Sequence, residues 1–174
     1  MMAGRPALLV NAAELLRDPG NRKHVSDVVP PADIDAESPA ITGDVVVEVD
    51  LESTVDDIGL SGTIGVPWAG HCRRCLKPLT ETLTIDVAER YAEASEDGSF
   101  GPDDDAFPIE RRQIDLRPMV REEVLLAVDE ARLCRQDCPG LCPVCGKDVS
   151  VERCDCDSTL VDDRWGVLDQ LRDE

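Results

Sequence analysis

Hydrophobic and polar residues alternate over three consecutive stretches of the chain, and this pattern predicts three β-strands. The first stretch is the valine-rich run 44–51, which ends at an Asp-Asp pair that predicts a turn. The second, 58–66, has glycines at three positions between its apolar residues, which favours a twisted or bulged strand. The third, 79–87, follows a tip at 72–77. Successive strands joined by short turns predict an antiparallel meander.

A helical period replaces this alternation after Asp115. We expect Asp115 to cap the main helix, with Pro118 in the first turn, where proline is tolerated. The apolar stripe of this helix should pack on the sheet as core. It consists of Leu116, Met119, Val120, Val124, Ala127 and Val128. The predicted fold class is therefore α+β, an antiparallel β-meander packed by one main helix, followed by a small C-terminal cysteine-rich zinc-binding segment.

These patterns divide the chain into three regions. Residues 1–40 should form a short helix over 12–17 and then an extended arm, because three prolines interrupt the arm. Residues 41–130 carry the meander and the main helix, with an acidic loop at 93–107. Residues 131–174 carry the cysteine-rich segment and a short C-terminal helix, which we expect to begin at Asp162 or Asp163.

Composition adds a strong acidic bias to this picture. The 174 residues carry 37 acidic and 18 basic side chains, a formal net charge of −19. A charge of this sign repels nucleic acid and anionic membranes and attracts basic partners. No apolar run approaches the roughly 20 residues that cross a bilayer, and the N-terminus does not resemble a secretory signal. We therefore expect a cytoplasmic protein that does not bind membranes.

The acidic residues avoid the segments that carry the cysteines. Residues 67–78 contain three basic side chains and no acidic one, and residues 131–153 are near balance. Random variation of surface charge is one explanation, and contact with an anionic partner is the other. On the second explanation, Trp68 and the basic side chains beside it are the candidate RNA contacts, although burial is the alternative role for Trp68. These basic side chains are Arg73, Arg74 and Lys77.

Eight cysteines in a reducing compartment point to a metal rather than to disulfides. Cys142-Pro-Val-Cys145-Gly146 has the form of a zinc knuckle, in which both thiolates face one ion. Six cysteines fall within 134–156, more than a dithiol redox enzyme needs. The clustering predicts a structural zinc site in this segment.

The spacing leaves the ligand set open. Cys142 and Cys145 form the most secure pair, and three pairs can complete the site. These are Cys134 with Cys138, Cys138 with Cys154, and Cys154 with Cys156. Cys72 and Cys75 either complete a second site or form an independent hairpin tip. Iron in a rubredoxin-like site of four thiolates is the inorganic alternative, although such sites normally use two similar knuckles and only one here is C-P-x-C-G.

Four ordered motifs resemble one known family. They are Cys72-Arg-Arg-Cys75-Leu76, Ile114-Asp115-Leu116, the run 138–146 and Cys154-Asp-Cys156. Together they resemble the bacterial YceD family, also called the large ribosomal RNA subunit accumulation proteins. The resemblance implies a part in the synthesis, processing or stability of large-subunit ribosomal RNA. It also implies metal and nucleic-acid binding, and some family members keep only the first C-x-x-C.

No catalytic constellation stands out in the sequence. There are two histidines, and the one beside Cys72 is expected to face solvent or to support a metal ligand. Three hypotheses follow. The first is a non-catalytic ribosome-biogenesis factor that engages large-subunit ribosomal RNA or a precursor particle. The second is an acidic holdase for a small basic protein of the large subunit. The third is a redox protein with iron held by four thiolates.

Overall fold

The computed structural model describes residues 8–93, 106–128 and 132–157. The chain divides into two compact units, which we call the sheet unit and the cysteine unit. The sheet unit comprises residues 1–70 and 80–130, and the cysteine unit comprises residues 71–79 and 131–174. All eight cysteines belong to the cysteine unit.

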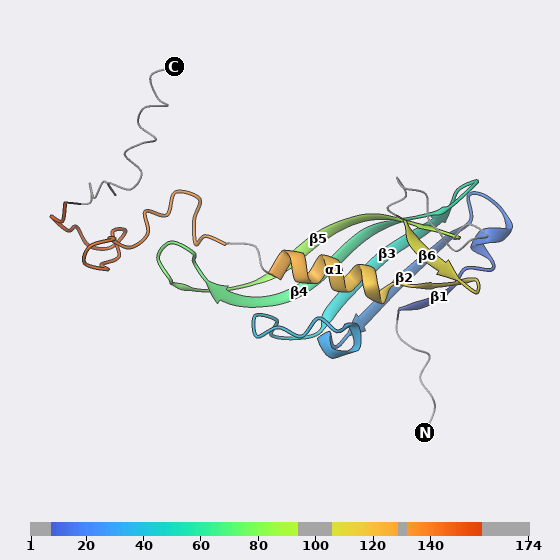
Figure 1. Ribbon diagram of the computed structural model, residues 1–174, viewed down its shortest axis with the longest axis horizontal. Helices are drawn as coiled ribbons and strands as arrows, with labels where there is room; N and C mark the ends of the chain where they lie inside the picture. Colours follow the sequence, from blue (N-terminus) through green and yellow to red (C-terminus); the bar gives the residue numbers. More distant parts are fainter. Residues whose placement is uncertain (1–7, 94–105, 129–131, 158–174) are drawn as a thin grey trace, which may run out of the picture. The chain divides into compact units, whose positions relative to one another are not determined.

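The described residues form one sheet of seven strands in the order β1-β7-β6-β5-β4-β3-β2 (Figure 1). The expected strands appear as β3, β4 and β5, and the strands at the ends of the sheet come from other parts of the chain. The bounds are β1 Leu9–Asn11, β2 Arg22–Val29, β3 Val45–Ser53, β4 Ile58–His71, β5 Pro78–Ala92, β6 Phe107–Glu110 and β7 Gln113–Asp115.

The sheet is mixed, which corrects the prediction of a purely antiparallel meander. β5 pairs with β6 in parallel, with Tyr91 opposite Phe107, whereas the pairs β2–β3, β3–β4, β6–β7 and β1–β7 are antiparallel. A parallel pair needs a crossover of about a dozen residues, and the segment between β5 and β6 is long enough to supply it. Most of the acidic loop predicted at 93–107 falls in this connection, although Phe107 belongs to β6, and residues 94–105 lie outside the described residues.

Residues 21–40, predicted as an extended arm, contribute an edge strand instead. β2 pairs with β3 over eight residues, from Arg22 opposite Glu52 to Val29 opposite Val45. The helix predicted over 12–17 is a 3-10 turn, η1 (Leu15–Arg17), and a second turn, η2, spans Pro31–Ile34. The N-terminal region is therefore part of the sheet unit.

The core lies between one face of the sheet and helix α1 (Arg117–Val128), which crosses that face (Figure 1). Alternate residues of β3 are fully buried, as the valine-rich pattern predicts. The helix begins as predicted, since Asp115 accepts a hydrogen bond from the amide of Arg117 at 3.0 Å. The buried residues of α1 are Met119, Val120, Val124 and Val128.

The C-terminal helix predicted from Asp162 or Asp163 lies outside the described residues. Within the described ranges, no helix has both the length and the apolar character that crossing a membrane requires.

Gly62 in β4 provides a test of the sheet register. It has φ +155°, and a Cβ there would lie 2.2 Å from the Glu48 carbonyl oxygen and 2.7 Å from the Val49 Cα. We expect Gly62→Ala to lower the free energy of unfolding by about 2–3 kcal/mol, because backbone atoms must move. Gly59→Ala is the matched control, since its Cβ would lie 3.9 Å from the Glu52 carbonyl oxygen. Equal denaturation midpoints for the two variants would contradict the register.

Candidate metal centres

The eight cysteines come together as two groups of four. Centre 1 consists of Cys72, Cys75, Cys134 and Cys138, and centre 2 consists of Cys142, Cys145, Cys154 and Cys156. Within each group, all four sulfur atoms lie within 4.8 Å of one another. Each group can therefore hold a metal ion.

Sulfur spacing in centre 1 fits a tetrahedral ion. The sulfurs of Cys72 and Cys138 are 3.8 Å apart, and those of Cys75 and Cys134 are 3.6 Å apart. Four sulfurs at about 2.3 Å from a tetrahedral zinc ion are separated by about 3.8 Å. The donor set and its spacing therefore fit zinc, with one ligand pair from the tip of β4–β5 and the other from residues 134–138.

Residues 72–77 and 142–147 form two knuckles with the same hydrogen bonds. In each, the amide of the first cysteine donates to the carbonyl of the lysine five residues later, at 2.8 and 2.7 Å. The amide four residues later donates back to the first cysteine carbonyl, at 2.9 Å in both knuckles. The knuckles are thus one repeated turn, and each serves a different centre.

In the sequence, only residues 142–146 have the C-P-x-C-G form of a zinc knuckle, because Leu76 stands where the second knuckle has Gly146. The sequence therefore left open whether Cys72 and Cys75 complete a second site or form a hairpin tip, and the structure places them in centre 1. Leu76 and Gly146 both adopt the left-handed conformation, with φ 60° and 73°. Glycine reaches this region without steric cost, whereas leucine does not. The shared pattern C-x-x-C-x-K, present at 72–77 and 142–147, is the signal that identifies both.

Backbone amides aim at the first sulfur of each knuckle. Amide donors from Cys75, Cys134 and Arg74 lower the pKa of the Cys72 thiol to about 6. In centre 2, the amides of Cys145 and Val144 lower the pKa of Cys142 to about 6. Each centre therefore has one cysteine poised as a thiolate at neutral pH, the form that ligates metals.

In each centre, the pKa of another cysteine shifts upward. A hydrogen bond with the Cys138 sulfur raises the pKa of Cys134 to about 12, and one with the Cys145 sulfur raises the pKa of Cys156 to about 12. A second thiolate beside the first is disfavoured by like charge. A bound cation removes this repulsion, because it lies between the sulfurs.

The two centres differ in their surroundings. In centre 1, Cys72, Cys75 and Cys138 are buried in a cluster with Leu79, Leu133 and Leu141, and Cys134 is exposed. In centre 2, Cys142 is buried, Cys145 is exposed and the other two cysteines are half-buried. Centre 1 therefore has the larger hydrophobic support.

The three basic side chains predicted to contact RNA all lie on the first knuckle, in different settings. The Arg74 Nη1 donates to the Cys138 carbonyl at 2.9 Å, and the Lys77 Nζ lies 3.0 Å from the Asp148 Oδ2. Arg73 is exposed, and its side chain makes no hydrogen bond or ion pair within the described part of the chain. Of these three cations, Arg73 is thus the most available to a partner.

The prediction that Trp68 contacts RNA is corrected by its burial. Trp68 is 4% exposed in the core of the sheet unit, and its backbone forms an antiparallel β-bridge with Ile41. Gly70 also lies against the ring, since a Cβ at Gly70 would approach it to 2.4 Å. Burial, the alternative weighed for Trp68, is its role.

Charge is unevenly divided between the two units. The described residues of the sheet unit carry 20 acidic and 8 Arg or Lys side chains. Those of the cysteine unit carry five acidic and seven Arg or Lys side chains. The net charge of −19 therefore belongs mainly to the sheet unit.

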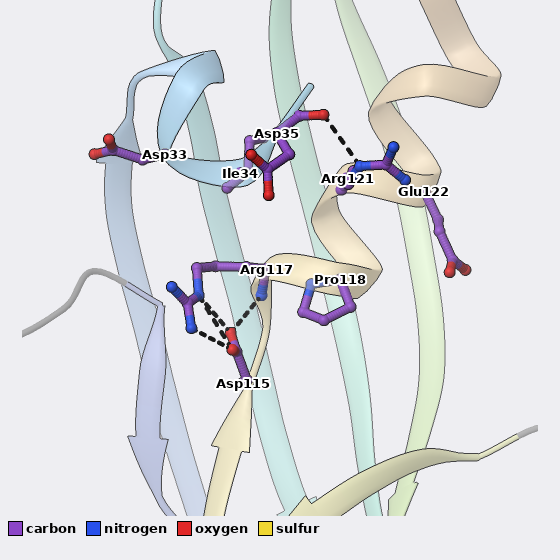
Figure 2. Close-up of a pocket in the computed structure, with 8 residues that line it drawn as sticks. All are labelled: Asp33, Ile34, Asp35, Asp115, Arg117, Pro118, Arg121 and Glu122. Carbon is purple, nitrogen blue, oxygen red and sulfur yellow. Dashed lines mark hydrogen bonds and ion pairs between the residues drawn. The ribbon is translucent and has the colours of Figure 1, made fainter. Parts of the chain in front are cut away.

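A groove of about 340 Å³ at the start of α1 is lined by charged residues of the sheet unit (Figure 2). The Arg117 Nε donates to the Asp115 Oδ1 at 2.8 Å, and the Arg121 Nε donates to the Asp35 carbonyl at 3.0 Å. Burial opposes ionisation of Asp115, but its hydrogen bonds to Arg117 hold its pKa below the ordinary value. These paired groups anchor the helix.

Known proteins resemble this chain over most of its length. An uncharacterised protein of Mycobacterium tuberculosis is 31% identical over 168 residues, which cover 94% of this chain and 81% of the relative. An uncharacterised protein of Mycobacterium leprae is 29% identical over 107 residues, covering 61% and 49%. A chloroplastic YCED homolog of Arabidopsis thaliana, named as a large ribosomal RNA subunit accumulation protein, is 28% identical over 108 residues, covering 56% and 34%. No solved structure matches the chain.

Family assignment rests on the part of the chain that carries both knuckles. Residues 60–172 match the family described as "Large ribosomal RNA subunit accumulation protein YceD". This range begins within β4 and includes all eight cysteines. The chain therefore belongs to the YceD family, as the four sequence motifs predicted.

Proposed function

We propose that this protein is a non-catalytic ribosome-biogenesis factor of the cytoplasm. It supports the synthesis, processing or stability of large-subunit (23S) ribosomal RNA, and structural zinc holds its contact surface. Membership of the YceD family supports a role in the accumulation of large-subunit ribosomal RNA. The observation that carries the mechanism is the first knuckle, where cations surround a four-cysteine group in an otherwise acidic chain.

Zinc is the metal that these ligands favour. Four thiolates in tetrahedral geometry are typical of structural zinc sites, and ordering of the ligands is coupled to binding. A rubredoxin-like iron site would join two similar knuckles, whereas here each centre combines one knuckle with a pair of another spacing. This arrangement favours zinc over the iron redox alternative.

The basic side chains of the cysteine unit also balance the metal centres. A zinc ion with four thiolates carries a formal charge of −2, so neighbouring cations are partly committed to it. Arg74 and Lys77 already bind groups of the same unit. We therefore assign the leading role in RNA contact to Arg73, because arginine pairs with phosphate in a bidentate manner.

The sheet unit favours a second candidate function. Its excess of acidic residues suits a basic partner, through long-range attraction. A small basic ribosomal protein of the large subunit has this character. In this alternative, the protein is an acidic holdase, and both functions can operate in one chain because they use different units.

Metal analysis tests the zinc proposal directly. We expect two zinc ions per chain, measured by inductively coupled plasma mass spectrometry on protein purified without added metal. Cys72→Ser with Cys75→Ser, or Cys142→Ser with Cys145→Ser, should each lower the content to one or less. Stoichiometric iron with visible colour would support the redox alternative, and a metal-free wild-type protein would contradict both.

Reversal of one charge tests the RNA contact. We expect Arg73→Glu to lower co-sedimentation with large-subunit precursor particles at least about fivefold, since a phosphate contact is replaced by repulsion. Arg111→Glu makes the same change of charge in the sheet unit and should leave co-sedimentation unchanged. Equal co-sedimentation of the two variants would contradict the contact assigned to Arg73. The zinc content of each variant, measured alongside, shows whether centre 1 is intact.

A salt series tests the holdase function. Binding of a purified basic ribosomal protein of the large subunit should weaken steeply between about 50 and 500 mM salt, because the attraction is screened. A pull-down with the chain as bait measures it. Absent or salt-insensitive binding would contradict an electrostatic holdase.

A further inference from the structure

The two centres share one short stretch of backbone. Cys138 belongs to centre 1 and Cys142 to centre 2, so the linker 139–141 separates ligands of different ions. The Leu141 amide donates to the Arg74 carbonyl at 3.1 Å. The Gly140 carbonyl accepts from the Val149 amide at 3.1 Å. The linker therefore forms a hydrogen bond with the first knuckle through Leu141. It forms another through Gly140, with Val149 just after the second knuckle.

Arg74 contacts this linker at two points, and it contacts Cys138, the residue before the linker, at a third. Besides the bond from Leu141, its guanidinium donates to the Cys138 carbonyl at 2.9 Å. Gly140 has φ +79°, and a Cβ there would lie 3.0 Å from the Arg74 carbonyl oxygen, so the two backbones are in close approach. Arg74 lies between Cys72 and Cys75. A ligand that immobilises these two cysteines therefore also restricts the linker, through its contacts with Arg74.

A second link joins the first knuckle to the region beyond Cys145. The Lys77 ammonium lies 3.0 Å from the Asp148 carboxylate and 3.4 Å from the Ser150 hydroxyl. Asp148 in turn forms a β-bridge with Leu141. Residues on both sides of the second knuckle, Leu141 and Asp148, are thus bonded to residues of the first knuckle.

We propose that the two centres bind metal cooperatively, with Arg74 as the positioning residue that couples them. This inference depends on the proposal that both centres hold metal. Metal at centre 1 immobilises Arg74 and Cys138, which orders the linker and places Cys142. Centre 2 then binds with less loss of conformational freedom. The coupling is reciprocal by thermodynamic linkage.

The burial of the cysteine ligands predicts which centre binds metal first. Three ligands of centre 1 are buried in an apolar cluster, whereas one ligand of centre 2 is buried. Centre 1 therefore fills first, and the cation-bearing first knuckle is set before the second centre closes. The position of Arg73 depends on centre 1, so metal occupancy and RNA contact are connected.

Cobalt(II) titration of the full chain tests this coupling. Cobalt in a four-thiolate site absorbs visible light, so absorbance and competition with a chelator report occupancy. Each centre is measured alone in the Cys142→Ser/Cys145→Ser and Cys72→Ser/Cys75→Ser variants. We expect the two-ion constant of the wild-type chain to exceed the product of the single-centre constants at least about tenfold.

Arg74→Ala tests the named residue, with Arg135→Ala as its matched control. Arg135 lies between two ligands of centre 1, and its side chain pairs with Asp137 at 3.4 Å. Arg74→Ala should lower the coupling factor about fivefold, because one charge-assisted hydrogen bond is lost. Arg135→Ala should leave the factor unchanged.

The outcomes separate this inference from the zinc proposal. Two cobalt ions bound with a coupling factor near one would overturn cooperativity and leave the metal centres standing. An equal factor in Arg74→Ala and Arg135→Ala would overturn the role of Arg74. No metal bound by the wild-type chain would overturn both proposals. Circular dichroism, recorded for every variant, identifies any variant that fails to fold. If Arg74→Ala fails to fold, the comparison of the wild-type two-ion constant with the two single-centre constants still tests cooperativity.

Discussion

The sulfurs of Cys72 and Cys138 lie 3.8 Å apart although 66 residues separate them in the chain, and those of Cys75 and Cys134 meet at 3.6 Å across 59 residues. This cluster of four thiols joins the two chain segments of the cysteine unit. The apolar cluster around it consists of the cysteines themselves and three leucines. The unit has 53 residues, and a unit of this size with so small a core commonly relies on a metal or disulfides. The position of the first knuckle relative to residues 134–138 follows from this contact.

Local charge reconciles the proposed contact with RNA with the acidic composition of the chain. Charges interact over about 8 Å at physiological ionic strength, so the charge near a surface decides what it binds. The cysteine unit carries more Arg and Lys than Asp and Glu, unlike the sheet unit. In the proposed zinc-bound form, part of that cationic excess would offset the thiolates of the two centres. The proposed contact with RNA therefore rests on side chains that bind no other group in the described part of the unit, Arg73 above all.

Prediction from sequence succeeded where one face of an element is buried. β3 and α1 follow the periods of their buried residues, and Asp115 caps the helix because its carboxylate reaches a free amide. β2 was missed because hydrophobicity does not alternate along it: its half-buried positions include Lys23 and Asp27, and the apolar Val28 is exposed. On its exposed face, His24 lies 2.9 Å from Asp50. Such a cross-strand pair depends on register, which a sequence pattern of one strand does not contain.

The sequence by itself determined the candidate ligands of this protein. The number and type of the cysteines favour metal binding over disulfides, and the C-P-x-C-G motif predicts a knuckle through local backbone geometry. Only the tertiary structure decided how eight cysteines divide into two centres, because that division depends on the meeting of 72–75 with 134–138. Spacing along the chain encodes local turns, whereas a metal centre is completed by contacts between distant segments. Burial of Trp68 and engagement of Arg74 were decided in the same way, by neighbours far away in the sequence.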